Sequence, residues 1–137
     1  MVNQRLHAGL LVSGLLMTVL TVSGCGGKDK PAVCSDVDTL KSSVTALTDI
    51  KVDQGALDKL QSQLTQVQDD YAQLKSDAKS EFSSELSAVD SAAASAKSSV
   101  QAASADPTAA NLAALAVPLQ ALASALSNLE SAVEDTC

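Results

Sequence analysis

Few side chains in this chain could carry chemistry, and the strongest nucleophile–base systems are missing. The chain contains one histidine (His7), one arginine (Arg5) and no tryptophan. Serine and cysteine nucleophiles usually need a histidine partner, and zinc sites commonly use histidine ligands. Beyond residue 24 neither histidine nor arginine occurs. We therefore expect a protein that is not an enzyme and holds no metal or cofactor.

Carboxylates are the most frequent ionisable groups after residue 24, and several occur in close pairs. These pairs are Asp36/Asp38, Asp69/Asp70 and Glu81/Glu85. The spacing of an EF-hand calcium loop is absent. Lys75-Ser76 and Lys79-Ser80 do not form catalytic dyads, because adjacent residues on a helix point apart. We interpret the carboxylates as a solvated helix surface.

The N-terminal segment carries a targeting pattern. An n-region with one fixed charge precedes the apolar run Ala8–Val22. This run is shorter than the roughly 20 residues that a spanning helix needs, and it matches a signal sequence. It ends in Thr21-Val22-Ser23-Gly24-Cys25. This ending resembles the lipobox of bacterial lipoproteins.

The resemblance implies that residues 1–24 are a cleaved signal peptide and that Cys25 becomes the first mature residue. Cys25 would carry diacylglycerol and further acyl chains such as palmitate. Several acyl chains hold a protein on a membrane almost permanently, here the cell membrane on its extracytoplasmic side. Residues 25–33 would form a lipidated flexible tether, and residues 34–137 an α-helical domain. The alternative is an uncleaved anchor helix.

Export would also determine the oxidation state of the two remaining cysteines, Cys34 and Cys137. Disulfides persist in oxidising compartments outside the cytoplasm. With Cys25 occupied by lipid, Cys34 and Cys137 form the only intramolecular pair, closing a loop of roughly 100 residues. The alternative is two free or intermolecular thiols.

The charge balance limits the partners. The whole chain has a formal net charge of −7, and loss of Arg5 with the signal peptide leaves eight lysines against 16 carboxylates, a net charge of −8. Nucleic-acid binding requires a basic face, so we expect no nucleic-acid partner. The same charge disfavours lying flat on an anionic membrane surface.

Residues 34–137 are expected to be helical almost throughout, because Gly and Pro punctuate this part only at Gly55, Pro107 and Pro118. The expected N-caps are Ser35, Asp53 and Asp106. We predict a kink at Pro118. The three predicted helical segments run from Ser35 to about Asp49, from Gln54 to about Ser104, and from Asp106 to about Asp135.

Apolar residues recur at alternating steps of three and four in each segment, as in coiled coils. The steps from Ala78 to Phe82 and on to Leu86 are both four, which we interpret as a stutter. We expect an all-α antiparallel hairpin or bundle of about three helices, stapled by the disulfide. One long central helix would carry the first and third segments on its two halves, with Leu47 opposite Leu57 and Val37 opposite Val67. An up-down four-helix bundle, broken around Lys79–Glu85, is the rival arrangement.

Two functional classes follow. The first is a non-catalytic structural or interaction lipoprotein of the bacterial cell envelope, with an envelope protein as partner. The alternative is a carrier or chaperone-like module that binds an apolar ligand in the Ala/Val-rich segment Val89–Ala103. The helical composition is loosely similar to murein lipoprotein, but the chain ends in Cys137 rather than in that family's wall-attaching lysine. The partner, the oligomeric state and the choice between inner and outer membrane stay open.

Overall fold

The computed structural model describes residues 30–78 and 80–137, and every regular element in this part of the chain is helical. The elements are α1 (Ala32–Thr48), the 3₁₀ turn η1 (Gln54–Ala56), α2 (Leu57–Ala78), α3 (Ser83–Ala105), α4 (Ala109–Ala114) and α5 (Ala116–Val133). The all-α prediction is confirmed. The predicted signal peptide and the lipidation residue Cys25 lie outside the described residues.

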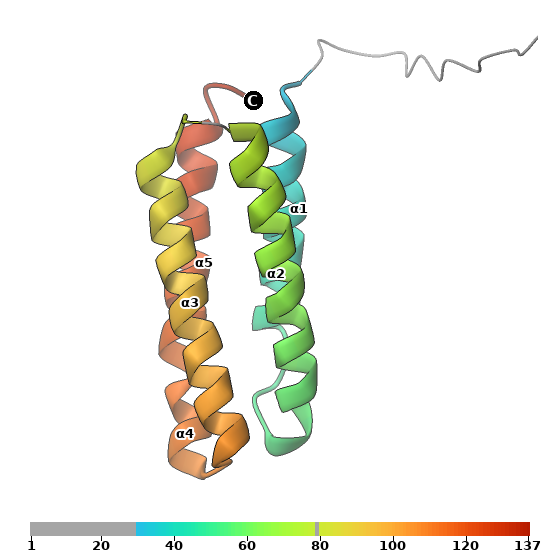
Figure 1. Ribbon diagram of the computed structural model, residues 1–137, viewed down its shortest axis with the longest axis vertical. Helices are drawn as coiled ribbons and strands as arrows, with labels where there is room; N and C mark the ends of the chain where they lie inside the picture. Colours follow the sequence, from blue (N-terminus) through green and yellow to red (C-terminus); the bar gives the residue numbers. More distant parts are fainter. Residues whose placement is uncertain (1–29, 79) are drawn as a thin grey trace, which may run out of the picture.

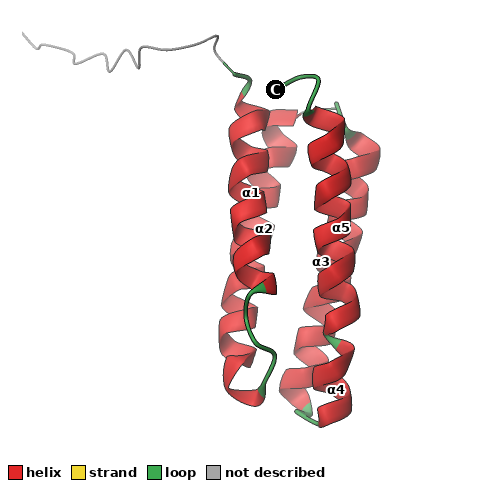
Figure 2. Ribbon diagram, turned by 180° about the vertical axis from the view of Figure 1, so that it is seen from behind, coloured by secondary structure: helices red, strands yellow, loops and turns green. Residues whose placement is uncertain are grey.

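Four long helices lie side by side and run alternately up and down (Figure 1). The most extensive packing joins α1 to α2 and α3 to α5, and less extensive contacts of α2 with α3 and of α1 with α5 complete a ring. The short helix α4 leads into α5 at the end opposite the C-terminus (Figure 2). The sequence correctly predicted that the first and third segments each lie on one half of the second.

The expected single long central helix is wrong. Helix α2 ends at Ala78 and α3 begins at Ser83, so the middle segment turns back on itself. Phe82 has a φ of 57°, a left-handed conformation that an α-helix cannot continue through. No Gly or Pro marks this turn. The 4-residue steps around Phe82, interpreted above as a stutter, belong instead to the turn.

Contacts across the turn explain why the chain folds back here. Phe82 is partly buried against the core. The Tyr71 hydroxyl of α2 donates a buried hydrogen bond of 2.9 Å to the Leu86 carbonyl oxygen of α3. In an extended two-helix rod each helix face would pack against one neighbour, whereas the fold-back gives each long helix two neighbours. Burial of apolar surface is the dominant favourable term in folding.

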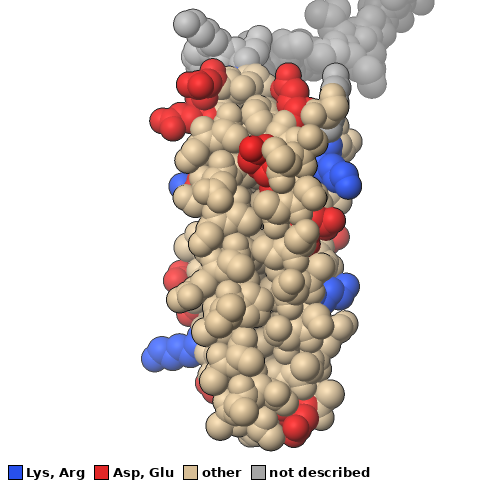
Figure 3. All heavy atoms as spheres, turned by 90° about the vertical axis from the view of Figure 1, so that its left-hand side faces the viewer, with Lys and Arg blue, Asp and Glu red and all other residues tan. Residues whose placement is uncertain are grey.

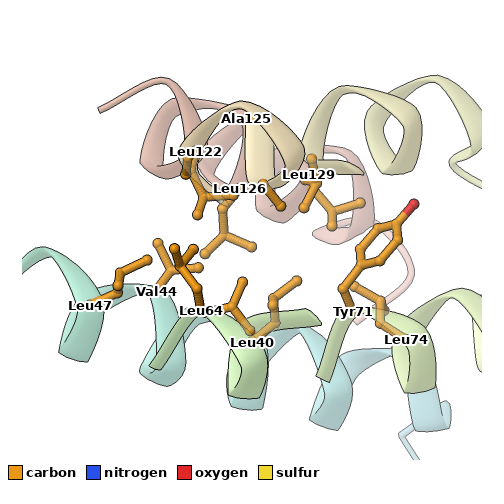
Figure 4. Close-up of a cluster of buried hydrophobic side chains, with 14 of the residues drawn as sticks. Leu40, Val44, Leu47, Leu64, Tyr71, Leu74, Leu122, Ala125, Leu126 and Leu129 are labelled. Carbon is orange, nitrogen blue, oxygen red and sulfur yellow. The ribbon is translucent and has the colours of Figure 1, made fainter. Parts of the chain in front are cut away.

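Buried positions follow the predicted steps of three and four closely. In α2, for example, the buried residues are Leu57, Leu60, Leu64, Val67, Tyr71, Leu74 and Ala78. Side chains from α1, α2 and α5 point toward one another in the interior (Figure 4). On α3 the buried positions after Val89 are Ala93, Ala96, Val100 and Ala103. Their small size matches the large Leu side chains that α5 contributes.

The register between α1 and α2 differs from the predicted one. The prediction paired Val37 with Val67, which puts Ser43 opposite residue 61. In the structure the Ser43 carbonyl oxygen accepts from the Gln63 side chain at 3.3 Å and the Ser43 hydroxyl donates to Asp70, so the contacts of Ser43 lie two to nine residues further along α2. The apolar pattern repeats along each helix, so it fixes the buried face and leaves the offset between the helices open.

Two of the predicted N-caps are wrong and one is confirmed. Asp53 caps η1, since its Oδ1 accepts from the Ala56 amide at 2.9 Å. Helix α1 begins at Ala32, before the expected cap Ser35, because Val33 and Cys34 are already buried in the core. Helix α4 is capped by Thr108 rather than Asp106, with the Asn111 amide donating to the Thr108 hydroxyl.

Pro118 disrupts the last segment as predicted. Proline has no amide hydrogen, so Pro118 cannot donate to the Ala114 carbonyl four residues earlier. Helix α4 accordingly ends at Ala114, and α5 begins at Ala116. Among the described residues, the combined stretch Ala109–Val133 is long and apolar enough to cross a membrane by length and composition. In the bundle, the buried leucines of this stretch face the core.

Candidate functional site

The end of the bundle where α1 begins and α5 ends holds the two cysteines (Figure 1). Cys34 and Cys137 are joined at disulfide-bonding distance, with their Cα atoms 5.7 Å apart. Cys34 is 4% exposed within the first turn of α1. The Cys137 amide donates to the Val133 carbonyl oxygen, which draws the C-terminus back over the end of α5. The predicted pairing is therefore the one that the structure contains.

A groove of about 330 Å³ runs beside this disulfide between α1 and α5. The Lys41 Nζ of α1 bridges it to the Glu130 Oε1 of α5 at 2.7 Å, and this contact raises the pKa of Lys41. Both charges are solvent-accessible, so the ion pair contributes little to stability.

Asp36 pairs with Asp77 of α2 rather than with Asp38, the neighbour suggested by the sequence. Burial and then the Asp77 carboxyl raise the pKa of Asp36, through a side-chain hydrogen bond and charge repulsion. A proton on Asp36 removes this repulsion. The Asp36 Oδ2 atom is buried without a hydrogen-bond partner. Only the α1–α2 register brings these residues together, so sequence spacing could not reveal them.

The other predicted carboxylate pairs separate into individual hydrogen-bonding roles. Asp70 accepts from Ser43, the buried polar residue of α1, and from Gln66 at 2.8 Å. Its neighbour Asp69 is exposed. Glu85 accepts from Ser84 at 2.8 Å, which lowers the pKa of Glu85. Within residues 30–78 and 80–137, no three potential metal-ligating side chains cluster together.

Two smaller grooves lie along the bundle. One of about 160 Å³ lies between α2 and α3, beside Leu64, Val100 and Lys97. The Lys97 ammonium donates to the Gln68 amide oxygen across it at 3.4 Å. The other, of about 150 Å³, lies beside Tyr71, whose pKa is raised by burial and by the charge of Asp90. This second groove is also lined by Lys75, Ser83 and Ser87.

Comparison with protein-family models, with curated proteins and with solved structures finds no match to this chain. Functional inference therefore rests on the residues and their geometry. The features available to it are a disulfide-closed end, a carboxyl pair, shallow grooves and the outer helix faces.

The disulfide should stabilise the bundle strongly. It spans a sequence separation of 103 residues, for which loss of chain entropy in the unfolded state predicts about 4–5 kcal/mol. We expect the C34S/C137S double variant to lose about this amount in urea unfolding followed by circular dichroism. A reducing agent should destabilise the wild-type chain equally and leave the variant unchanged. Equal stabilities of the two chains without reductant would contradict the assignment.

The Asp36–Asp77 pair should make stability depend on pH. The raised pKa of Asp36 means that the folded state binds a proton more tightly than the unfolded state, whose pKa is near 3.8. Stability is therefore lost as the pH rises from 3.8 through the folded-state pKa. Asp36→Asn should stabilise the protein at pH 7 by less than about 1 kcal/mol, because solvent screens the pair.

The stabilisation by Asp36→Asn should vanish below pH 3.8, where Asp36 is neutral in both the folded and the unfolded state. Asp69→Asn provides the control, since it removes the same charge from an exposed position. Urea unfolding of the three chains at several pH values measures the effect. If Asp36→Asn and Asp69→Asn change the free energy of unfolding equally at every pH, the effect comes from net charge alone and the prediction is wrong.

Proposed function

We propose that this protein is a membrane-anchored, extracytoplasmic lipoprotein that acts as a non-catalytic structural or interaction module of the bacterial cell envelope. The observation that carries the proposal is the Cys34–Cys137 disulfide. Such a bond persists in an oxidising compartment, which is where the lipobox-like segment ending at Cys25 would deliver the chain.

The position of the described N-terminus supports an anchored module. The described chain starts at Lys30, and α1 begins two residues later at the disulfide end of the bundle. Lipid on Cys25 would thus hold this end close to the membrane. The turns at η1 and α4 would then form the far end (Figure 2). In this orientation the long sides of the bundle are presented to other envelope components.

The chemistry of the described residues favours binding over catalysis. Beyond residue 24 the chain lacks histidine and arginine, and the hydroxyls of Ser91, Ser95 and Ser131 donate to carbonyls of their own helices. The grooves are lined by scattered Ser, Gln, Lys and acidic side chains. Side chains of these types can bind other molecules, but beyond residue 24 there is no histidine to activate a nucleophile among them.

The carrier alternative receives less support. The segment proposed for an apolar ligand, Val89–Ala103, has its apolar face buried, with Val89, Ala96 and Ala103 each at most 1% exposed. A ligand could enter this seam only if α3 separated from α5 or from α2, whose contact with α3 is less extensive. Uptake of a fluorescent apolar probe by the oxidised protein would favour the carrier function.

We also infer that the helices pack in coiled-coil fashion, with knobs in holes along their seams. The regular burial at steps of three and four supports this packing. Rigid seams of this type would hold the outer faces of the helices in fixed positions, as an interaction module requires.

Lipidation of Cys25 provides the test of the proposed function. Intact mass of the protein from the host membrane should correspond to residues 25–137 plus a diacylglycerol and acyl increment. Cys25→Ser should lose the increment and retain residues 1–24, because lipid transfer precedes cleavage in this type of export. Cys34→Ser is the matched control and should stay lipidated. A wild-type chain without lipid would refute the anchor and with it the proposed function.

A further inference from the structure

The two cysteines of the disulfide differ in their exposure. Cys34 lies in the first turn of α1, is 4% exposed and belongs to the buried core. Cys137 lies beyond the end of α5 and is exposed. Both border the groove of about 330 Å³ between α1 and α5, so an external molecule can approach the bond through this groove. One half of the disulfide is therefore fixed in the core, and the other half faces solvent.

The segment that carries Cys137 has few attachments of its own. Residues 134–137 are all exposed. The amides of Thr136 and Cys137 both donate to one carbonyl oxygen, that of Val133, at 2.9 Å. If the sulfur–sulfur bond breaks, this segment is free to move, whereas the ion pair and the shared burial of α1 and α5 remain.

Thiol–disulfide exchange begins when a thiolate attacks one of the two sulfurs, and access decides which sulfur is attacked. Attack on the Cys34 Sγ needs a path to a residue that is 4% exposed and packed in the core. Attack on the Cys137 Sγ meets an exposed residue at the edge of the groove. Exchange should therefore place a mixed disulfide on Cys137 and release Cys34.

We propose that Cys137 is the site at which this protein exchanges its disulfide with a dithiol protein, which opens and closes the Cys34–Cys137 bond. The partner's first thiolate forms a bond to the Cys137 Sγ, and the original S–S bond breaks with Cys34 leaving as a thiolate. The partner's second thiol loses its proton, attacks the mixed disulfide and releases Cys137 as a thiolate. The cysteine pair thus gains two electrons and the dithiol becomes a disulfide. An oxidised partner closes the bond by the same steps in reverse.

The charges at this end of the bundle select the surface of the partner. The groove beside the disulfide is lined by three carboxylates, those of Asp38, Glu130 and Glu134, against two lysines. Asp135 is exposed next to Glu134. Figure 3 shows acidic side chains gathered toward this end. A thiolate is itself an anion, so the partner that fits this end carries basic groups around its reactive thiol.

A small neutral thiol locates the attacked sulfur in the wild-type chain. The oxidised full-length protein is treated briefly with 2-mercaptoethanol, quenched with acid and fragmented, and the adduct is located by mass spectrometry. Early adducts should lie on Cys137 at least about tenfold more often than on Cys34. Equal labelling, a preference for Cys34, or no adduct before circular dichroism shows that the bundle unfolds would overturn the proposal.

Two single variants provide a matched pair, because each loses the same disulfide. Cys34→Ser keeps Cys137, and Cys137→Ser keeps Cys34. After reduction, each receives the disulfide of 2-mercaptoethanol, and Cys137 should form its adduct at least about tenfold faster than Cys34. In concentrated urea the two rates should agree within about twofold, because the difference comes from the fold. Equal rates in two variants that circular dichroism shows to be folded would contradict the assignment.

Charged thiols test the expected surface of the partner. Cysteamine carries a positive charge and 2-mercaptoethanesulfonate a negative one. Their rates per thiolate are each divided by the rate with a small neutral disulfide, which removes differences in intrinsic reactivity. On this scale cysteamine should reduce the wild-type bond at least about threefold faster, and the ratio should approach one at ~1 M salt. A ratio at or below one at low salt would overturn the basic partner.

The attacked sulfur and the lipid on Cys25 are measured separately. The location of the dithiol partner in the cell envelope rests on the proposed function, whereas attack at Cys137 is measured on the purified protein. A chain without lipid on Cys25 would refute the proposed function and leave the exchange site standing. Attack at Cys34 would overturn the exchange site and leave the anchor standing.

Discussion

Closure of the ring of helices between α1 and α5 is the constraint on which the rest of the structure depends. The chain itself links α1 to α2, α2 to α3 and α3 through α4 to α5 by short turns. The first and last helices have no such link and are held by the Cys34–Cys137 disulfide, the Lys41–Glu130 ion pair and shared burial. Without closure the two hairpins could separate, exposing the leucine seams that face each other in the interior (Figure 4).

The two hairpins differ in surface chemistry. Helices α1 and α2 alternate buried Leu and Val with Asp, Lys and Gln on their outer sides. Helices α3 and α5 combine small buried Ala on one helix with large buried Leu on the other, and present mostly Ala and Ser outside. The α1–α2 layer thus carries more charged side chains than the α3–α5 layer, whose charges are Glu85, Asp90, Lys97 and Glu130.

Heptad spacing predicted the buried face of every long helix, because burial of apolar stripes dominates helix packing. It left the break around Lys79–Glu85 as the rival arrangement only, because the turn there has a left-handed aromatic residue, Phe82, in place of the usual Gly signal. It also could not fix the α1–α2 register, since the apolar pattern repeats along each helix. The Asp36–Asp77 pair depends on that register, so it escaped sequence analysis. The disulfide was predictable because only Cys34 and Cys137 remained for pairing once the resemblance to a lipobox assigned Cys25 to lipid.

The distance between the far turns of the two hairpins tests the folded-back arrangement most directly. The Gln54 side-chain amide donates to the Pro107 carbonyl oxygen at 2.9 Å, so these turns lie together. Spin labels attached at the exposed Val52 and Ala110 without using cysteine chemistry, and measured by pulsed electron paramagnetic resonance, should report a distance well below ~30 Å, the length of a 20-residue helix. A distance near ~75 Å, the length of an unbroken helix over residues 54–104, would contradict the account.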